Sequence, residues 1–157
     1  EIMADLTYNT KTKDSVFTKL FSDKENVLQL YKDLNPDDTD ITVDDIDIQT
    51  LESVLAHTIY NDLGFIAKER FVLLVEAQSR WNDNMTLRMA FYLFETYRRY
   101  LDITKQSEHY PTKVKLPMPD LYVVYTGDKK NVSKEISFND DFFNGKSPVD
   151  IRVKILT

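Results

Sequence analysis

The sequence predicts an α/β fold of the α+β type, in which helices flank a mixed central sheet. Two continuous apolar runs, residues 71–75 and 121–125, are typical of strands covered on both faces. The segment between them, residues 85–103, has the apolar spacing of a long helix. Residues 149–155 alternate between apolar and polar side chains, as in a half-exposed strand. With the N-terminal segments, the predicted order is helices, three strands, helix, strand, strand.

The composition indicates one globular domain over residues 1–157, because 42% of the side chains are hydrophobic and the chain is long enough to bury a core. The absence of cysteine excludes disulfides, thiolate zinc sites and cysteine nucleophiles. It agrees with the cytoplasmic location that we expect. No apolar stretch approaches the length of a membrane span, so we expect no membrane partner. The net charge of −6 argues against a protein that coats nucleic acid, but it leaves room for a local basic patch.

The N-terminal segments predict two helices after a polar stretch, residues 1–12, that we expect to be poorly ordered. Residues 13–21 place apolar side chains at helical spacing. Ser22 and Glu25 then form a capping-box pattern that opens a second helix, which Asn35-Pro36 ends. Glu25 is the N-cap partner in this interpretation and a metal ligand in the alternative one. We also expect a C-terminal part to be missing, since the chain stops within an apolar alternation.

The segment between the second helix and the hairpin is acidic at first and then mostly apolar. Residues 37–47 hold spaced aspartates without the glycine and glutamate of a calcium loop, so they predict a solvated loop. Residues 48–60 fit a strand or a short helix, and we favour a strand because it leads into the hairpin. Within this strand Glu52 is a candidate metal ligand.

A β-hairpin follows that we expect to carry two carboxylates. If its turn is centred on Glu69, Asp62 lies opposite Glu76, with Cβ atoms roughly 5 Å apart. Alternation adds Gln78 to the same face. Carboxylates this close need a cation or a proton between them, and oxygen ligands favour Mg²⁺ or Mn²⁺. A turn centre displaced by half a residue would put the pair on opposite faces. In the alternative interpretation, Asp62 is a turn residue and Glu76 marks where the strand reaches solvent.

The long helix follows Asn82-Asp83-Asn84, which offers N-cap residues. Glu95 and Arg99 have the spacing of a favourable ion pair. Phosphate binding by the arginines and a solvated face with extended arginine stems both fit the positive charge of this helix. Its predicted buried face consists of Leu87, Phe91, Phe94, Tyr97 and Leu101.

The remaining segments are a charged, proline-containing loop, a strand, an irregular stretch and a last strand. The loop is residues 105–119, and the strand at 121–125 closes at Thr126-Gly127. Residues 128–148 predict mostly irregular structure. The last strand is predicted at residues 149–155.

Several short motifs lie in an order and at spacings that together are fairly specific. The motifs are Lys13-Asp-Ser-Val-Phe-Thr-Lys-Leu-Phe21, Asn61-Asp62 with Phe65, Glu76-Ala-Gln-Ser79, Asn84-Met85, Leu87-Arg88 and Tyr122-Val-Val-Tyr-Thr-Gly127. With them the chain resembles the PD-(D/E)XK nuclease family transposases, also called recombination-promoting nuclease/putative transposase proteins, over about residues 13–155.

The resemblance implies a restriction-endonuclease-like core that hydrolyses a DNA phosphodiester with Mg²⁺, for which Mn²⁺ should substitute. By position, Asp62 resembles the motif aspartate and Glu76 the (D/E) residue, while Gln78 stands where the general superfamily has lysine. A glutamine can orient the attacking water but brings no charge to the developing phosphorane. Further metal ligands are the backbone carbonyl of Ala77 and Glu52 or Glu25, and the candidate phosphate contacts are Ser79, Arg80, Arg88 and Lys19.

Three functions remain open from the sequence. The first is a DNA endonuclease linked to transposition or recombination, with a homodimer as a candidate form. The second is a DNA-binding or regulatory module that keeps the nuclease fold without cleavage, which the glutamine and the acidic charge favour. The third is a protein-interaction module in which the acidic pair is a remnant.

Overall fold

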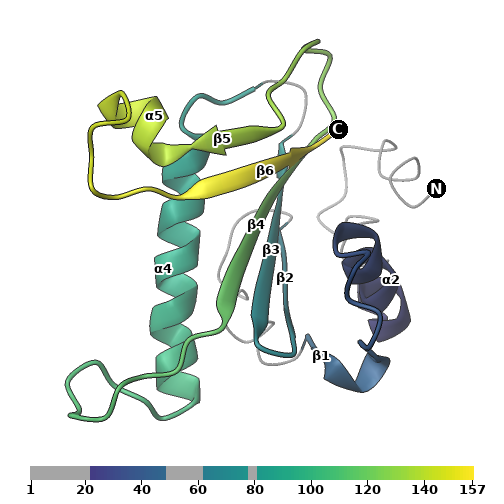
Figure 1. The fold of residues 1–157 in the computed structure, drawn as a ribbon, viewed down its shortest axis with the longest axis vertical. Coiled ribbons are helices and arrows are strands. Elements are labelled where there is room, and N and C mark those ends of the chain that lie inside the picture. Colours follow the sequence, from purple (N-terminus) through teal and green to yellow (C-terminus); the bar gives the residue numbers. More distant parts are fainter. Residues whose placement is uncertain (1–21, 49–61, 78–80) are drawn as a thin grey trace.

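The computed structural model describes residues 22–48, 62–77 and 81–157, and Figure 1 shows their arrangement. The described residues form a six-stranded sheet in the order β1-β2-β3-β4-β6-β5. In chain order the elements are α2 (Lys24–Leu34), a 3-10 turn (Val43–Asp45), β1 (Ile46–Asp47), β2 (Asp62–Ala67), β3 (Arg70–Ala77), α4 (Met85–Ile103), β4 (Met118–Tyr125), β5 (Glu135–Ser137), α5 (Phe138–Phe143) and β6 (Arg152–Leu156).

The sheet joins an antiparallel part to a parallel part at β3. Strands β1, β2 and β3 pair antiparallel in succession. After β3 the chain crosses over through α4 and returns as β4, which is parallel to β3. Strand β6 is parallel to β4, and β5 pairs antiparallel with β6 at the edge. A helical crossover is what a parallel pair requires, and it places α4 on one face of the sheet (Figure 1).

The predicted fold class, a mixed central sheet flanked by helices, is confirmed. Strand β3 is buried on both faces, as its apolar run predicts. Its residues Val72 and Leu74 belong to the core cluster that contains α2, whereas Leu73 and Val75 belong to the cluster that contains α4. Alternation along one central strand therefore supplies both cores. No helix among the described residues is long and apolar enough to cross a bilayer.

Helix α2 has its predicted end but a different N-cap. The side chain of Asp23 accepts a hydrogen bond from the backbone N–H of Glu25 at 3.0 Å, so Asp23 rather than Ser22 caps the helix. The capping box predicted for Ser22 and Glu25 is therefore wrong. Serine and aspartate are both preferred N-cap residues, and α2 begins one residue later than the sequence pattern suggested. Asn35 is the C-cap, as predicted.

Helix α4 has the predicted span, but the predicted buried face is wrong. Phe91 and Phe94 are 65% and 60% exposed, and Leu87, Tyr97 and Leu101 are only partly buried. The helix carries a second stripe, made mostly of small or flexible side chains, that allows a closer approach to the sheet. That stripe forms the buried face and consists of Met85, Thr86, Met89, Ala90, Leu93 and Thr96.

The C-terminal region contains two elements that the sequence pattern did not predict. Strand β5 and helix α5 lie within residues 128–148, which were expected to be mostly irregular. Ser137 caps α5 by accepting a hydrogen bond from the N–H of Asp140 at 3.2 Å. Strand β6 begins at Arg152, three residues later than predicted, and confirms the alternation, since Val153 and Ile155 are buried while Arg152 and Lys154 are exposed. The predictions for residues 1–21 and 49–60 lie outside the described residues.

Candidate metal and phosphate site

The hairpin of β2 and β3 has a register that differs from the predicted one by one residue. Its turn consists of Lys68 and Glu69, so Ala67 pairs with Arg70. Lys68 lies in the left-handed region with φ 55°, as tight two-residue hairpin turns require. The centre of the turn thus falls between Lys68 and Glu69 rather than on Glu69. As a result Asp62 pairs with Val75, and the prediction that it lies opposite Glu76 is wrong.

This shift removes the argument that alternation places the two acids on one face. A one-residue change of register moves every position to the other face. Val75 belongs to the α4 cluster, whereas the neighbours of Glu76 at alternate positions, Val72 and Leu74, belong to the α2 cluster. The side chain of Asp62 and all of Gln78 lie outside what the structure describes.

Glu76 is a partly buried carboxylate at the carboxyl end of the central strand. Its neighbours Val75 and Ala77 are buried, and in register it pairs with Val124 of β4. Within the described part of the chain, no hydrogen bond or ion pair satisfies this carboxylate. The carbonyl of Ala77 accepts a hydrogen bond from the N–H of Thr126 at 3.2 Å, which leaves one lone pair for another partner. The Glu76 carboxylate and the Ala77 carbonyl therefore both have oxygen lone pairs that a hard cation could accept.

The sheet face that carries Glu76 also carries positive charge. The register that joins Leu74 to Tyr122 of β4 continues to Lys154 of β6. The Lys154 Nζ atom lies 5.7 Å from the centre of the Tyr122 ring. Alternation places Lys154 and Arg152 on the same face as Glu76. Arg152 is already paired with Glu135 at 2.8 Å and with Asp150 at 3.2 Å, so Lys154 is the better placed of the two for an added anion.

A polar network occupies the opposite end of this face. Arg70 and Asp120 form an ion pair at 2.7 Å, and this hydrogen bond raises the pKa of Arg70. Tyr31 donates a hydrogen bond to Asp38 at 2.8 Å. Burial, and then this bond, raise the pKa of Tyr31 to about 12, while the same bond lowers the pKa of Asp38. Glu76 lies six positions along β3 from Arg70, which is about 20 Å. Lys68 of the hairpin turn also pairs with Asp38 at 3.3 Å, so these contacts link the hairpin to the segment after α2 and lie outside the candidate site.

The other predicted site residues are not brought to Glu76 by the described structure. Glu25 is exposed in the first turn of α2. Arg88 lies on α4, which packs against the other face of the sheet, and its guanidinium carbon is 6.0 Å from the centre of the Tyr92 ring. Residues 22–48, 62–77 and 81–157 hold no group of three acids or histidines with metal-binding spacing. Lys19, Glu52, Ser79 and Arg80 lie outside these ranges.

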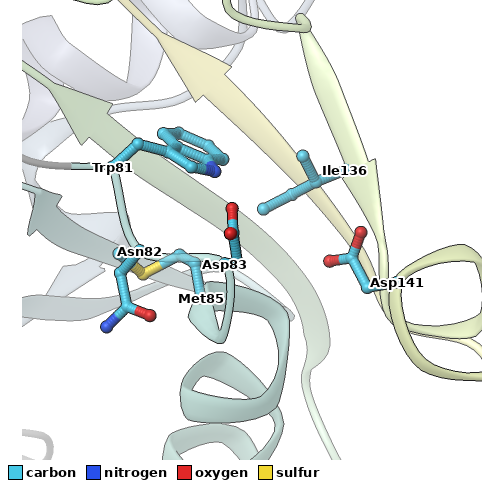
Figure 2. A pocket seen from close by; sticks show the side chains of 6 residues that line it. All are labelled: Trp81, Asn82, Asp83, Met85, Ile136 and Asp141. Atoms are coloured by element: carbon cyan, nitrogen blue, oxygen red, sulfur yellow. The ribbon is translucent and has the colours of Figure 1, made fainter.

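A pocket of about 260 Å³ lies at the N-terminal end of α4, on the face opposite to Glu76. Figure 2 shows the carboxylates of Asp83 and Asp141 and the Trp81 ring around it. The hydroxyl of Thr86 donates to Asp141 at 2.8 Å, and Trp81 packs edge-on against Tyr125. Sequence reasoning treated residues 82–84 only as helix caps and missed this pocket. Its carboxylates make it a poor place for phosphate.

A comparison of the chain with family models, with curated proteins and with solved structures found no match.

Proposed function

We propose that the chain is a metal-dependent DNA endonuclease domain of the cytoplasm, linked to transposition or recombination. The observation that carries the proposal is Glu76, a partly buried carboxylate that no described residue satisfies. It lies where the parallel strands β3 and β4 end, which is where α/β sheets commonly bind ligands. The resemblance adds the identity of the ligand and of the reaction. The mixed sheet flanked by helices agrees with the restriction-endonuclease-like core that the resemblance implies.

The donor set fits a hard divalent cation. Glu76 supplies a carboxylate, the carbonyl of Ala77 supplies a second oxygen, and the chain has no thiolate to compete. In the proposal Asp62 is the third ligand, and Glu52 or Glu25 could complete the set. When bound, Mg²⁺ or Mn²⁺ stabilises the negative charge of the phosphate as a Lewis acid. Asp62 is the first residue of β2, so the proposal requires its carboxylate to reach the ion from the end of the β2–β3 strand pair.

The protein's own residues position the reactants in this mechanism. Gln78 orients the attacking water through its side-chain amide, in line with the scissile phosphodiester. Because glutamine brings no charge, a cation elsewhere must neutralise the phosphate. Lys154 lies on the same face as Glu76 and takes this role, together with Ser79, Arg80 and Lys19 in the proposal. Arg88 lies on the other face of the sheet, so it contacts the DNA only if the DNA also reaches α4.

A second candidate is a module that keeps this fold and binds DNA or protein without cleavage. The register of the hairpin favours it, because Asp62 pairs with Val75 instead of lying opposite Glu76. A site with Glu76 as its single strand-borne acid would hold a metal weakly. The glutamine at position 78, in place of a lysine, also favours this second candidate. Cleavage and metal binding separate the two candidates.

The test of the proposal is cleavage of supercoiled plasmid with Mg²⁺ or Mn²⁺, compared with the same reaction in EDTA. We expect metal-dependent nicking that falls by on the order of 100-fold in Asp62→Asn and in Glu76→Gln, since each removes a charged ligand while keeping its shape. Glu69→Gln at the exposed turn is the matched control and should cleave normally. Cleavage that survives both site substitutions would refute the assignment. An inactive but DNA-binding protein would favour the second candidate.

A further inference from the structure

The large apolar side chains that remain exposed are concentrated around α4 and the segments at its two ends. Helix α4 carries Phe91, Phe94 and Ile103, and the loop after it carries Tyr110 and Leu116. Helix α5, which lies beside the N-terminal end of α4 in Figure 1, and the loop after it add Phe142, Phe143 and Val149. The remaining one in the described residues is Met118, which alternation along β4 directs to the other face. An apolar surface of this kind is typical of a protein interface.

An apolar stripe of α4 lies apart from its buried face and follows a regular pattern. The exposed Phe91 and Phe94 lie between the partly buried Leu87 and Leu101, at spacings of four, three and seven residues, and we call these four residues the outer stripe. Positions alternately three and four residues apart form the seam along which two helices pack together. Arg98 continues the same spacing, so a positive charge follows the apolar centre of the stripe towards its C-terminal end. The pattern is typical of a surface that packs against another helix.

We propose that the outer stripe binds the same stripe of a second copy of this chain, with the two α4 helices antiparallel. In this arrangement Phe91 of one copy packs on Phe94 of the partner subunit, and the two-fold axis passes between them. The inference does not rest on the nuclease function. It assigns a dimer face to a protein for which the sequence suggested a homodimer without a surface.

Charge complementarity selects a second copy in the antiparallel orientation. Arg88 and Glu95 flank the outer stripe on the same side, before and after its centre. Within one chain Arg88 lies against the Tyr92 ring, and Glu95 accepts a hydrogen bond from Arg99 at 2.8 Å through Oε1, so the contact across the dimer adds to these interactions. An antiparallel pair centred on Phe91 and Phe94 puts Arg88 beside Glu95 of the partner subunit, and symmetry repeats the contact. A parallel pair would instead set Arg98 against Arg98 of the partner subunit, which is repulsive.

The two ends of the surface fit the same arrangement. The Phe142 and Phe143 rings lie at the N-terminal end of α4, where Thr86 contacts α5. Tyr110 and Leu116 lie in the loop beyond its C-terminal end. An antiparallel partner brings the first pair next to the second, so both ends of the surface are covered at once. The interface then has aromatic side chains at its centre and its ends, where binding energy concentrates.

The first test is the oligomeric state of the full chain by sedimentation over a range of concentrations. We expect a dimer whose Kd rises at least about 30-fold in Phe91→Asp and in Phe94→Asp. Met118→Asp is the matched control. The Met118 side chain is 62% exposed, an exposure similar to that of Phe91 and Phe94, but it lies away from the stripe. A protein that stays monomeric at concentrations up to about 100 µM would overturn the proposal, as would equal weakening by all three substitutions.

The second test measures the relative orientation of the two α4 helices by disulfide cross-linking, and it does not depend on weakening the interface. The chain has no cysteine, so engineered thiols react without background. Arg88→Cys and Glu95→Cys chains that carry different mass tags are mixed and oxidised. We expect the mixed disulfide to exceed each self-disulfide by about tenfold or more, because antiparallel packing separates the two copies of position 88 by nine residues, about 13 Å. Self-disulfides in equal or greater yield would contradict the antiparallel dimer.

Discussion

The two faces of the sheet carry different chemistry, although they share the strands β3, β4 and β6. On these strands all charged side chains lie on the α2 face: Arg70, Glu76, Asp120, Arg152 and Lys154. The α4 face is built from apolar residues such as Leu73, Val123 and Val153. Helix α4 spans 19 residues and α2 only 11, so the longer helix covers the apolar face.

This difference separates a face suited to chemistry from a face suited to association. A helix on an apolar face needs no polar partners there, and it leaves its outer stripe available to a second protein. A face with charges at alternate strand positions can hold a metal or a phosphate, at some cost in stability. The predictions below test this division, beginning with the largest expected effect.

Leu73 and Leu74 are neighbours on β3 that enter the two different cores. Each is fully buried, so truncation to alanine should lower the free energy of unfolding by about 2–5 kcal/mol. Leu73→Ala should fall nearer the lower value, because its cluster contains Met85 and Met89, whose flexible side chains can relax into the cavity. Leu74→Ala should cost more, since the described residues of its cluster include no methionine that could relax into the cavity. Urea unfolding measures both, and the reverse order would contradict this view of the cores.

If Glu76 serves a metal site, its side chain should lower the stability of the metal-free protein. Its partly buried carboxylate has no partner within the described residues, which is unfavourable. Glu76→Gln should therefore raise the free energy of unfolding by about 1 kcal/mol in EDTA. Added Mn²⁺ should stabilise the unmodified protein and not the variant. A loss of stability in Glu76→Gln without metal would show that Glu76 has a structural partner instead.

Two tyrosines, one on each side of the sheet, should respond differently to acid. Tyr97 donates to the neutral carbonyl of Pro117 at 2.7 Å, so Tyr97→Phe should cost about 1 kcal/mol at every pH between 3 and 8. Tyr31 donates to the charged Asp38, and Tyr31→Phe should cost more at neutral pH. The pKa of Asp38 is lowered in the fold, so this stabilisation is complete above the ordinary value of 3.8.

The stabilisation is then lost as the pH falls through the lowered pKa of Asp38. Unfolding experiments at a series of pH values should show the difference between Tyr31→Phe and the unmodified protein shrinking below about pH 4. A difference that stays constant down to pH 2 would mean that the charge of Asp38 does not matter for this bond.

The elements that sequence reasoning predicted well are those with long, strong patterns. Strand β3 follows from its continuous apolar run, and α4 follows from the helical spacing of its apolar residues and matches its predicted span. The Glu95–Arg99 ion pair, at 2.8 Å, follows directly from the helical spacing. Elements of three to six residues, such as β5 and α5, offer too few positions for a period to show.

Two errors arose where the sequence allowed two answers. Helix α4 has two apolar stripes, and only packing against the sheet decides which of them is buried. The hairpin accepts a turn centred on Glu69 or one centred between Lys68 and Glu69, and both leave the strands apolar. The observed turn depends on Lys68 adopting a left-handed conformation, which its residue type does not indicate. The register error bears on function, because it removes the predicted opposition of Asp62 and Glu76.

The most direct test of the nuclease site is calorimetric titration of Mn²⁺ into the unmodified protein, Asp62→Asn, Glu76→Gln and the double variant. If the two carboxylates share one ion, each single substitution should remove most of the affinity, and the double variant should lose little more. Strictly additive losses would place the acids in separate sites. Absence of binding to the unmodified protein would contradict the metal site altogether and leave a fold whose outer α4 surface is its functional part.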